Sequence, residues 1–168
     1  LAELEDLYLP FRPKRRTRAA VAREKGLEPL AEFMFAQTGL DPEDAAAAFV
    51  DPELKVSSIQ DALAGARDIM AEWINEDAEA RSEIRNLFAE KAVLSSRVVA
   101  GKETEGAKYR DYFDWSEPLK DAPSHRVLAM RRGEREDILT LSITPPEDDA
   151  VRLLTARFVR RTGPNSDQ

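Results

Sequence analysis

Apolar residues recur at helical spacing in two successive stretches of the chain. The first stretch covers residues 59–74 and places Ile59, Leu63, Ala66, Ile69, Met70, Trp73 and Ile74 on one face. The second places Ile84, Leu87, Phe88, Leu94 and Val98 on one face and ends at Gly101. An apolar stripe of this kind is typical of a helix that buries one side. We therefore expect two amphipathic helices that form a core or contact another domain.

Start and stop signals predict a helix-turn-helix-like pair over residues 17–37. Thr17 is a suitable N-cap for a helix that runs to about Lys25, and Gly26 can end it in the left-handed conformation. Pro29 fits the first turn of a second helix that stops before Gly39. That second helix carries Glu28, Glu32, Phe33, Met34 and Phe35. Base edges are read mainly by Arg, Lys, Asn and Gln, so we do not expect this helix to read bases.

Three further start signals follow. The pair Asp41-Pro42 predicts a short helix, and Asp51-Pro52 repeats the same signal. Ser57 with Gln60 forms a capping box ahead of the stripe at 59–74.

The C-terminal part predicts a helix, a strand and another helix. Ser124 can cap a helix that Gly133 ends, and 147–161 returns to helical spacing. Between them, residues 138–144 alternate apolar and polar positions, which is the period of a half-buried strand. A single strand leaves backbone donors and acceptors unsatisfied. We therefore expect it to pair with a second copy, an irregular segment or a domain outside this chain.

These elements predict a mainly α fold with a minor β element near residues 138–144. They also predict three segments: a helical region at 1–122, a helix-strand-helix segment at 123–161, and a disordered tail at 162–168. The chain begins with Leu1 and an interrupted helical pattern. We therefore expect it to be a piece of a longer protein.

Charge is unevenly distributed along the 168 residues, whose net charge is −7. Acids dominate between Asp41 and Glu90, whereas seven basic residues and one acid lie between Arg12 and Lys25. A cluster of cations can neutralise successive phosphates and release their counterions. The residues that we predict to contact nucleic acid are Arg12, Lys14, Arg15, Arg16 and Arg18. The alternative is that these side chains pair with the acids of the 41–90 stretch.

Aromatic side chains form a second candidate binding feature, a run of four beside Lys108 and Arg110: Tyr109, Tyr112, Phe113 and Trp115. Proteins that bind single strands stack bases on such rings. Aromatic rings also dominate burial in protein cores, and for this run we favour packing.

No pattern indicates catalysis, a metal site or a cofactor. His125 is the only histidine, and Ser124 beside it points about 100° away on a helix. The acids of Glu147-Asp148-Asp149 are better explained by the first turn of a helix, whose dipole they complement. Cysteine is absent, which excludes disulfides. No apolar run is long enough to cross a bilayer, so we expect no membrane partner.

Several segments resemble the Tex family of bacterial transcription accessory proteins. The most specific is 4–18 (LEDLYLPFRPKRRTR), which continues in 22–31 (AREKGLEPLA). Two others are 105–113 (EGAKYRDYF) with 117–119 (EPL), and 123–133 (PSHRVLAMRRG). Their order and spacing also match the family. The resemblance covers the chain to about Arg161.

The resemblance implies a non-catalytic helical N-terminal region of a long, cytoplasmic, multidomain protein. In the family this region precedes an RNase-H-like domain, helix-hairpin-helix elements and a C-terminal RNA-binding domain of the OB-fold type. The expected function is to contribute to RNA or DNA binding and to interdomain scaffolding. The alternative is a scaffold that docks on RNA polymerase or on the remaining Tex domains without touching nucleic acid.

Overall fold

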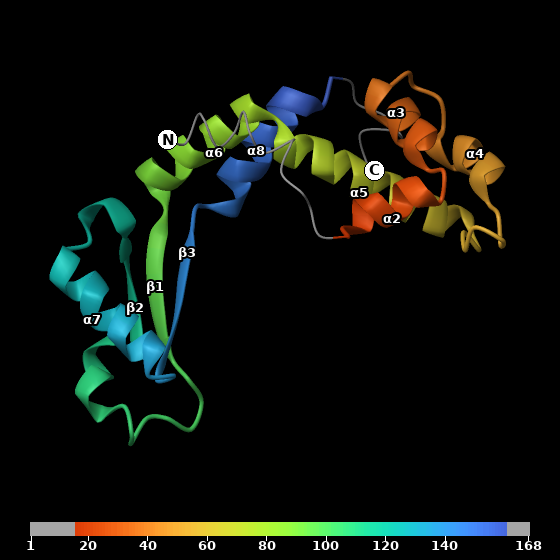
Figure 1. The fold of residues 1–168 in the computed structure, drawn as a ribbon. Coiled ribbons are helices and arrows are strands. Elements are labelled where there is room, and N and C mark those ends of the chain that lie inside the picture. Colours follow the sequence, from red (N-terminus) through yellow and green to blue (C-terminus); the bar gives the residue numbers. More distant parts are fainter. Residues whose placement is uncertain (1–15, 161–168) are drawn as a thin grey trace. The chain divides into compact units, whose positions relative to one another are not determined.

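The structure, a computed structural model, describes residues 16–160 and is mainly α with a small antiparallel sheet, as predicted (Figure 1). The chain forms two compact units. One unit contains Leu1–Ser82 and Leu154–Gln168, and the other contains Glu83–Leu153. The junction predicted at 122/123 lies within the second unit, and the tail at 162–168 lies outside the described residues. Among the helices that the structure describes, none combines the length and hydrophobicity that a membrane span requires.

The first unit is built on the long helix α5 (Ile59–Glu76), the clearest helix predicted from the sequence. Against it pack α2 (Arg18–Glu24), α3 (Glu28–Ala36), α4 (Pro42–Ala46) and the short 3-10 helix η2 (Ala47–Phe49). Small residues allow the close approach: a Cβ on Gly65 of α5 would lie 2.3 Å from Leu27 Cδ1. The core is completed by large side chains such as Leu30, Leu63 and Ile69, each fully buried. Such burial stabilises a fold by roughly 1.5–3 kcal/mol per side chain.

Several of the predicted helix ends are confirmed. The hydroxyl of Thr17 accepts a hydrogen bond from Ala20 N at 3.0 Å. Gly26 follows α2 with a φ of +74°, in the left-handed region where glycine meets no steric penalty. Asp41 caps α4 by accepting from Glu43 N at 2.8 Å.

Two predicted signals are corrected. Asp51-Pro52 begins no helix, because the backbones of Asp51 and Val56 pair in an isolated bridge that closes a turn. The cap of α5 is Ser58, one residue later than predicted; it accepts from Asp61 N, and Asp61 accepts from Ser57 N. Helix α3 stops before Gly39, as predicted, and the left-handed residue that ends it is Gln37, with a φ of 51°.

The second predicted stripe divides between a helix and a strand. Helix α6 is Ala78–Lys91, and the chain then forms β1 (Val93–Val98), where a continued helix was predicted. The prediction was wrong because β1 is the central strand of the sheet. It pairs antiparallel with β2 (Asp114–Pro118) and with β3 (Leu139–Thr144). Strand β3 was predicted correctly. The prediction that it pairs with a second copy, an irregular segment or a domain outside this chain was wrong, because it pairs with β1 of the same chain.

Helix α7 (Ser124–Arg135) covers one face of this sheet (Figure 1). Gly133 does not end the helix as predicted: it lies buried in its last turns, where a Cβ would come within 2.6 Å of Leu139 Cδ1. The aromatic run packs into the same core, as favoured from the sequence. Its members lie on the 3-10 helix η3 (Ala107–Tyr112), just after it, and on β2. The 3-10 helix η4 (Leu119–Asp121) precedes α7, and α8 (Glu147–Phe158) follows β3.

Candidate nucleic-acid interface

The structure describes two of the five predicted binding residues. Arg12, Lys14 and Arg15 lie outside the described residues. Arg16 precedes the cap of α2, and its guanidinium lies 2.6 Å from the Glu24 carboxylate. Arg18 is the first residue of α2, and its Nε lies 3.4 Å from Asp68 on α5. Both side chains nevertheless remain largely open to solvent, Arg16 at 69% and Arg18 at 88%.

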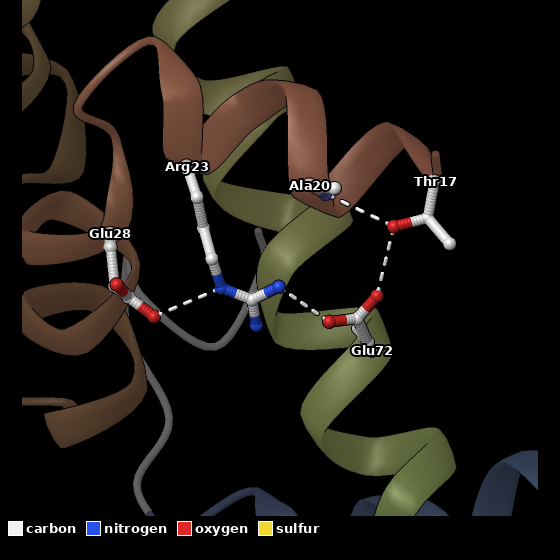
Figure 2. Close-up of polar contacts among 5 residues, drawn as sticks. All are labelled: Thr17, Ala20, Arg23, Glu28 and Glu72. Carbon is white, nitrogen blue, oxygen red and sulfur yellow. Dashed lines mark hydrogen bonds and ion pairs between the residues drawn. The ribbon is translucent and has the colours of Figure 1, made fainter. Parts of the chain in front are cut away.

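Arg23 differs from its basic neighbours because it is held inside the helical unit (Figure 2). Its Nε donates to Glu28 at 3.0 Å and its Nη1 to Glu72 at 2.5 Å. The side chain of Arg23 is 32% exposed and that of Glu72 is 12% exposed. The hydrogen bond to Glu72 is the main cause of the raised pKa of Arg23. We conclude that Arg23 joins α2 to α5.

The alternative raised for the basic run, pairing with acids of the 41–90 stretch, is therefore observed in part. Arg23 uses Glu72 of that stretch in a half-buried contact, and Arg18 uses Asp68 in an exposed one. Arg16 uses Glu24, the last residue of α2, which lies outside the 41–90 stretch. Burial separates the roles: Arg23 is a structural residue, whereas Arg16 and Arg18 are neutralised only at the surface.

An open depression of about 400 Å³ lies between α2 and α5, beside the exposed arginines. The cations on its lining are Arg16, Arg18 and Lys25, and the carboxylates are Asp61 and Asp68. Glu24, which pairs with Arg16 at 2.6 Å, adds a third carboxylate beside the lining, so three cations face three carboxylates. The Nζ of Lys25 donates to the Lys55 carbonyl at 2.9 Å, so this ammonium is directed to one side. The charges at the depression therefore balance, and its arginines stand out by their exposure.

Sequence reasoning did not single out a second group of exposed cations, which lies on α7. Arg131, Arg132 and Arg135 are all exposed to solvent in the second unit. The signal was present in the sequence, because residues 124–133 contain three arginines and no acid. Recognising it required knowing which side of α7 faces the sheet.

The remaining candidate residues occupy ordinary structural positions. His125 is exposed at the start of α7, next to Ser124. Glu147, Asp148 and Asp149 lie in the first turn of α8, as expected. Asp149 accepts from Lys91 Nζ at 2.7 Å, and this hydrogen bond holds the pKa of Asp149 below its ordinary value.

Fold and surface together define a mainly helical module with exposed arginines on both units. Residues 37–165 match the family model described as Tex central region-like. The chain is 49% identical over 140 residues to "Protein tex" of Bordetella pertussis, covering 83% of this chain and 18% of that protein. It is 44% identical over 146 residues to "Transcriptional accessory protein Tex" of Neisseria gonorrhoeae, covering 87% and 19%. A human relative, "S1 RNA-binding domain-containing protein 1", is 29% identical over 151 residues, covering 84% and 15%.

The chain belongs to the Tex family, and the region it matches is the central one. It spans less than a fifth of the length of these curated relatives.

Proposed function

We propose that this chain is a non-catalytic module of a cytoplasmic transcription accessory protein that contributes to RNA or DNA binding and to interdomain scaffolding. The observation that carries the proposal is the exposure of Arg16 and Arg18, at 69% and 88%, at the start of α2. Both guanidiniums are reachable by a large polyanion from solvent. The depression beside them adds Lys25 to the same surface.

Neighbouring carboxylates do not prevent this role. Exposed ion pairs contribute only about 0–1 kcal/mol each, so a phosphate can replace a carboxylate at little cost. Phosphate binding also releases condensed counterions, which makes the exchange favourable at low salt. The relatives support this setting, since one is named a transcriptional accessory protein and another an S1 RNA-binding domain-containing protein.

The test is the salt dependence of binding to a fluorescein-labelled 20-nucleotide single strand, as oligo-dT and as oligo-U. Arg16→Gln/Arg18→Gln should weaken binding and lower the slope of log K against log salt by about 1.4, or roughly 0.7 per lost contact. The matched control is Lys91→Gln/Arg97→Gln, which removes two exposed cations from the other unit. Equal losses in both variants would contradict the proposed contact.

A scaffold that docks on RNA polymerase or on other Tex domains is the second candidate. It is favoured by large apolar side chains that stay exposed around α4, namely Leu40, Val50 and Leu54. Exposed apolar groups that lie near one another often mark an interaction surface. Absence of oligonucleotide binding at low salt would favour this candidate. In the same samples we expect no nuclease activity above a metal-free blank.

A further inference from the structure

Helix α7 presents three exposed arginines to solvent near its C-terminal end. Its inward side carries Met130 and Gly133, both buried against the sheet core. The opposite side carries exposed residues that recur every three or four positions: His125, Leu128, Arg131, Arg132 and Arg135. At this spacing they share one face of the helix. Arg131 and Arg132 are adjacent, and Arg135 follows about one turn later, a rise of roughly 5.4 Å.

The arginines on this surface are weakly neutralised. Within the described residues, no carboxylate forms an ion pair with Arg132 or Arg135, and Arg131 pairs only with Glu134, at the surface. The acid that follows the helix, Glu136, is held mainly by other groups, and its attraction to Arg132 is the smallest of the interactions that lower its pKa. Lys108 Nζ lies 2.6 Å from one of its oxygens, and the Tyr109 hydroxyl donates to the other at 2.9 Å.

Arg126 of the same helix shows how a structural arginine differs. It pairs with Glu117 of β2, its guanidinium lies 4.8 Å from the centre of the Trp115 ring, and its side chain is only 28% exposed. Arg126 therefore holds α7 onto the sheet. The three outward arginines make no comparable contact to the sheet.

We propose that the outward surface of α7 binds the phosphate backbone of single-stranded nucleic acid, as a contact separate from the start of α2. Arginine suits this role because its planar fork can donate two hydrogen bonds to one phosphate. Ser124 adds a hydroxyl of the kind that contacts phosphate oxygens, and Leu128, 69% exposed, offers an apolar surface for a sugar or base. The inference deepens the proposed function by naming a second site and its ligand class.

A local explanation for the same residues makes a different prediction. Arg132 and Arg135 lie in the last turn of α7, where cations favour the helix dipole. If this were their whole role, their removal would lower helix stability without a specific effect on oligonucleotide binding. Binding and unfolding must therefore both be measured.

The experiment compares three variants of the chain on the labelled single strands. Arg131→Gln/Arg132→Gln/Arg135→Gln should lower the slope of log K against log salt by about 2, or roughly 0.7 per contact. The control Lys91→Gln/Arg97→Gln/Lys102→Gln makes the same charge change in the same unit and should keep most of the slope. The Lys-substituted variant Arg131→Lys/Arg132→Lys/Arg135→Lys should retain most of the binding, since charge is conserved. Urea denaturation of each variant reports whether it is folded.

The outcomes separate this inference from the proposed contact at α2. If oligonucleotide binding weakens in the α7 variant but not in Arg16→Gln/Arg18→Gln, the result supports the α7 site and contradicts the proposed contact at α2. If oligonucleotide binding weakens only in Arg16→Gln/Arg18→Gln, the α7 site is overturned and the proposed function remains supported. An equal loss in the α7 variant and its matched control, or no binding by the unmodified chain at low salt, also overturns the inference. In the last case an acidic protein surface becomes the better partner.

Discussion

Arg23 of α2 and Thr17, the cap of the same helix, converge on one carboxylate, that of Glu72 on α5 (Figure 2). The guanidinium lies 2.5 Å from one oxygen, and the hydroxyl donates to the other at 3.0 Å. One acid therefore fixes both the cap and the last turn of α2 to the central helix. The arrangement explains why this arginine, unlike Arg16 and Arg18, is not available to a ligand.

Removal of that acid should destabilise the helical unit. Glu72→Ala leaves the half-buried guanidinium of Arg23 with Glu28 alone and removes the acceptor for Thr17. A lost hydrogen bond to a charged group costs about 1.5–3 kcal/mol, and we expect a loss in that range. The measurement is urea denaturation followed by circular dichroism. Glu32→Ala, which truncates an exposed acid on α3, should change stability by less than about 0.5 kcal/mol. Equal effects would show that the contact contributes little.

Gly133 tests the packing of α7 on the sheet. In a helix interior, Ala is favoured over Gly by about 1 kcal/mol, so propensity alone predicts that Gly133→Ala stabilises the protein. A Cβ there would lie 2.6 Å from Leu139 Cδ1 and 2.9 Å from its Cγ, which is too close. Overpacking typically costs about 1–3 kcal/mol, so we expect net destabilisation in urea. Combining it with Leu139→Ala should cost less than the sum of the two single changes; additive costs would contradict the steric explanation.

Gln37 holds the end of α8 onto the helical unit. Its Nε2 donates to the Phe158 carbonyl at 2.7 Å, and its Oε1 accepts from Arg160 N at 2.8 Å. Gln37→Asn keeps the amide and tolerates the left-handed backbone at this position, but its side chain is one methylene shorter. Amide hydrogen exchange at Arg160 should become several-fold faster. Exchange at Val159, whose amide bonds to Thr155 O within the helix, should change less. Unchanged exchange at the Arg160 amide would mean that the two hydrogen bonds of the Gln37 side chain do not persist in solution.

Glu136 should contribute to the dependence of stability on pH. The hydrogen bond from Lys108, followed by that from Tyr109, holds the pKa of Glu136 below its ordinary value. Acidification therefore protonates the unfolded state first. The stabilisation is present above the unfolded pKa of about 4.3 and is lost as pH falls through the lower folded pKa. Glu136→Gln should lower stability at neutral pH and flatten its decline in acid, measured by urea denaturation across a pH series.

The control for this prediction is Asp121→Asn. Asp121 is exposed and forms no ion pair among the described residues, so its removal should leave the acid limb of the stability curve almost unchanged. If the stability of Glu136→Gln declines in acid as steeply as that of the unmodified chain, other carboxylates cause the pH dependence.

Helix boundaries set by short-range contacts were predictable. The cap at Thr17, the left-handed Gly26 and the start at Asp41-Pro42 each depend on atoms a few residues away. The alternation in β3 was equally plain, because a half-buried strand has a period of two. Such patterns identified a mainly α fold with one minor β element.

Residues 93–98 needed partners distant in the chain. Their apolar positions are compatible with a helix, and pairing with β2 and β3 made them a strand: Val93 lies opposite Pro118 and Thr144. The same holds for the charged surface. The seven basic residues between Arg12 and Lys25 look alike in sequence, yet Glu72, 49 positions from Arg23, holds Arg23 away from the open surface. Burial depends on which elements pack together, and no local pattern carries that information, so the division between structural and exposed arginines came from the folded chain.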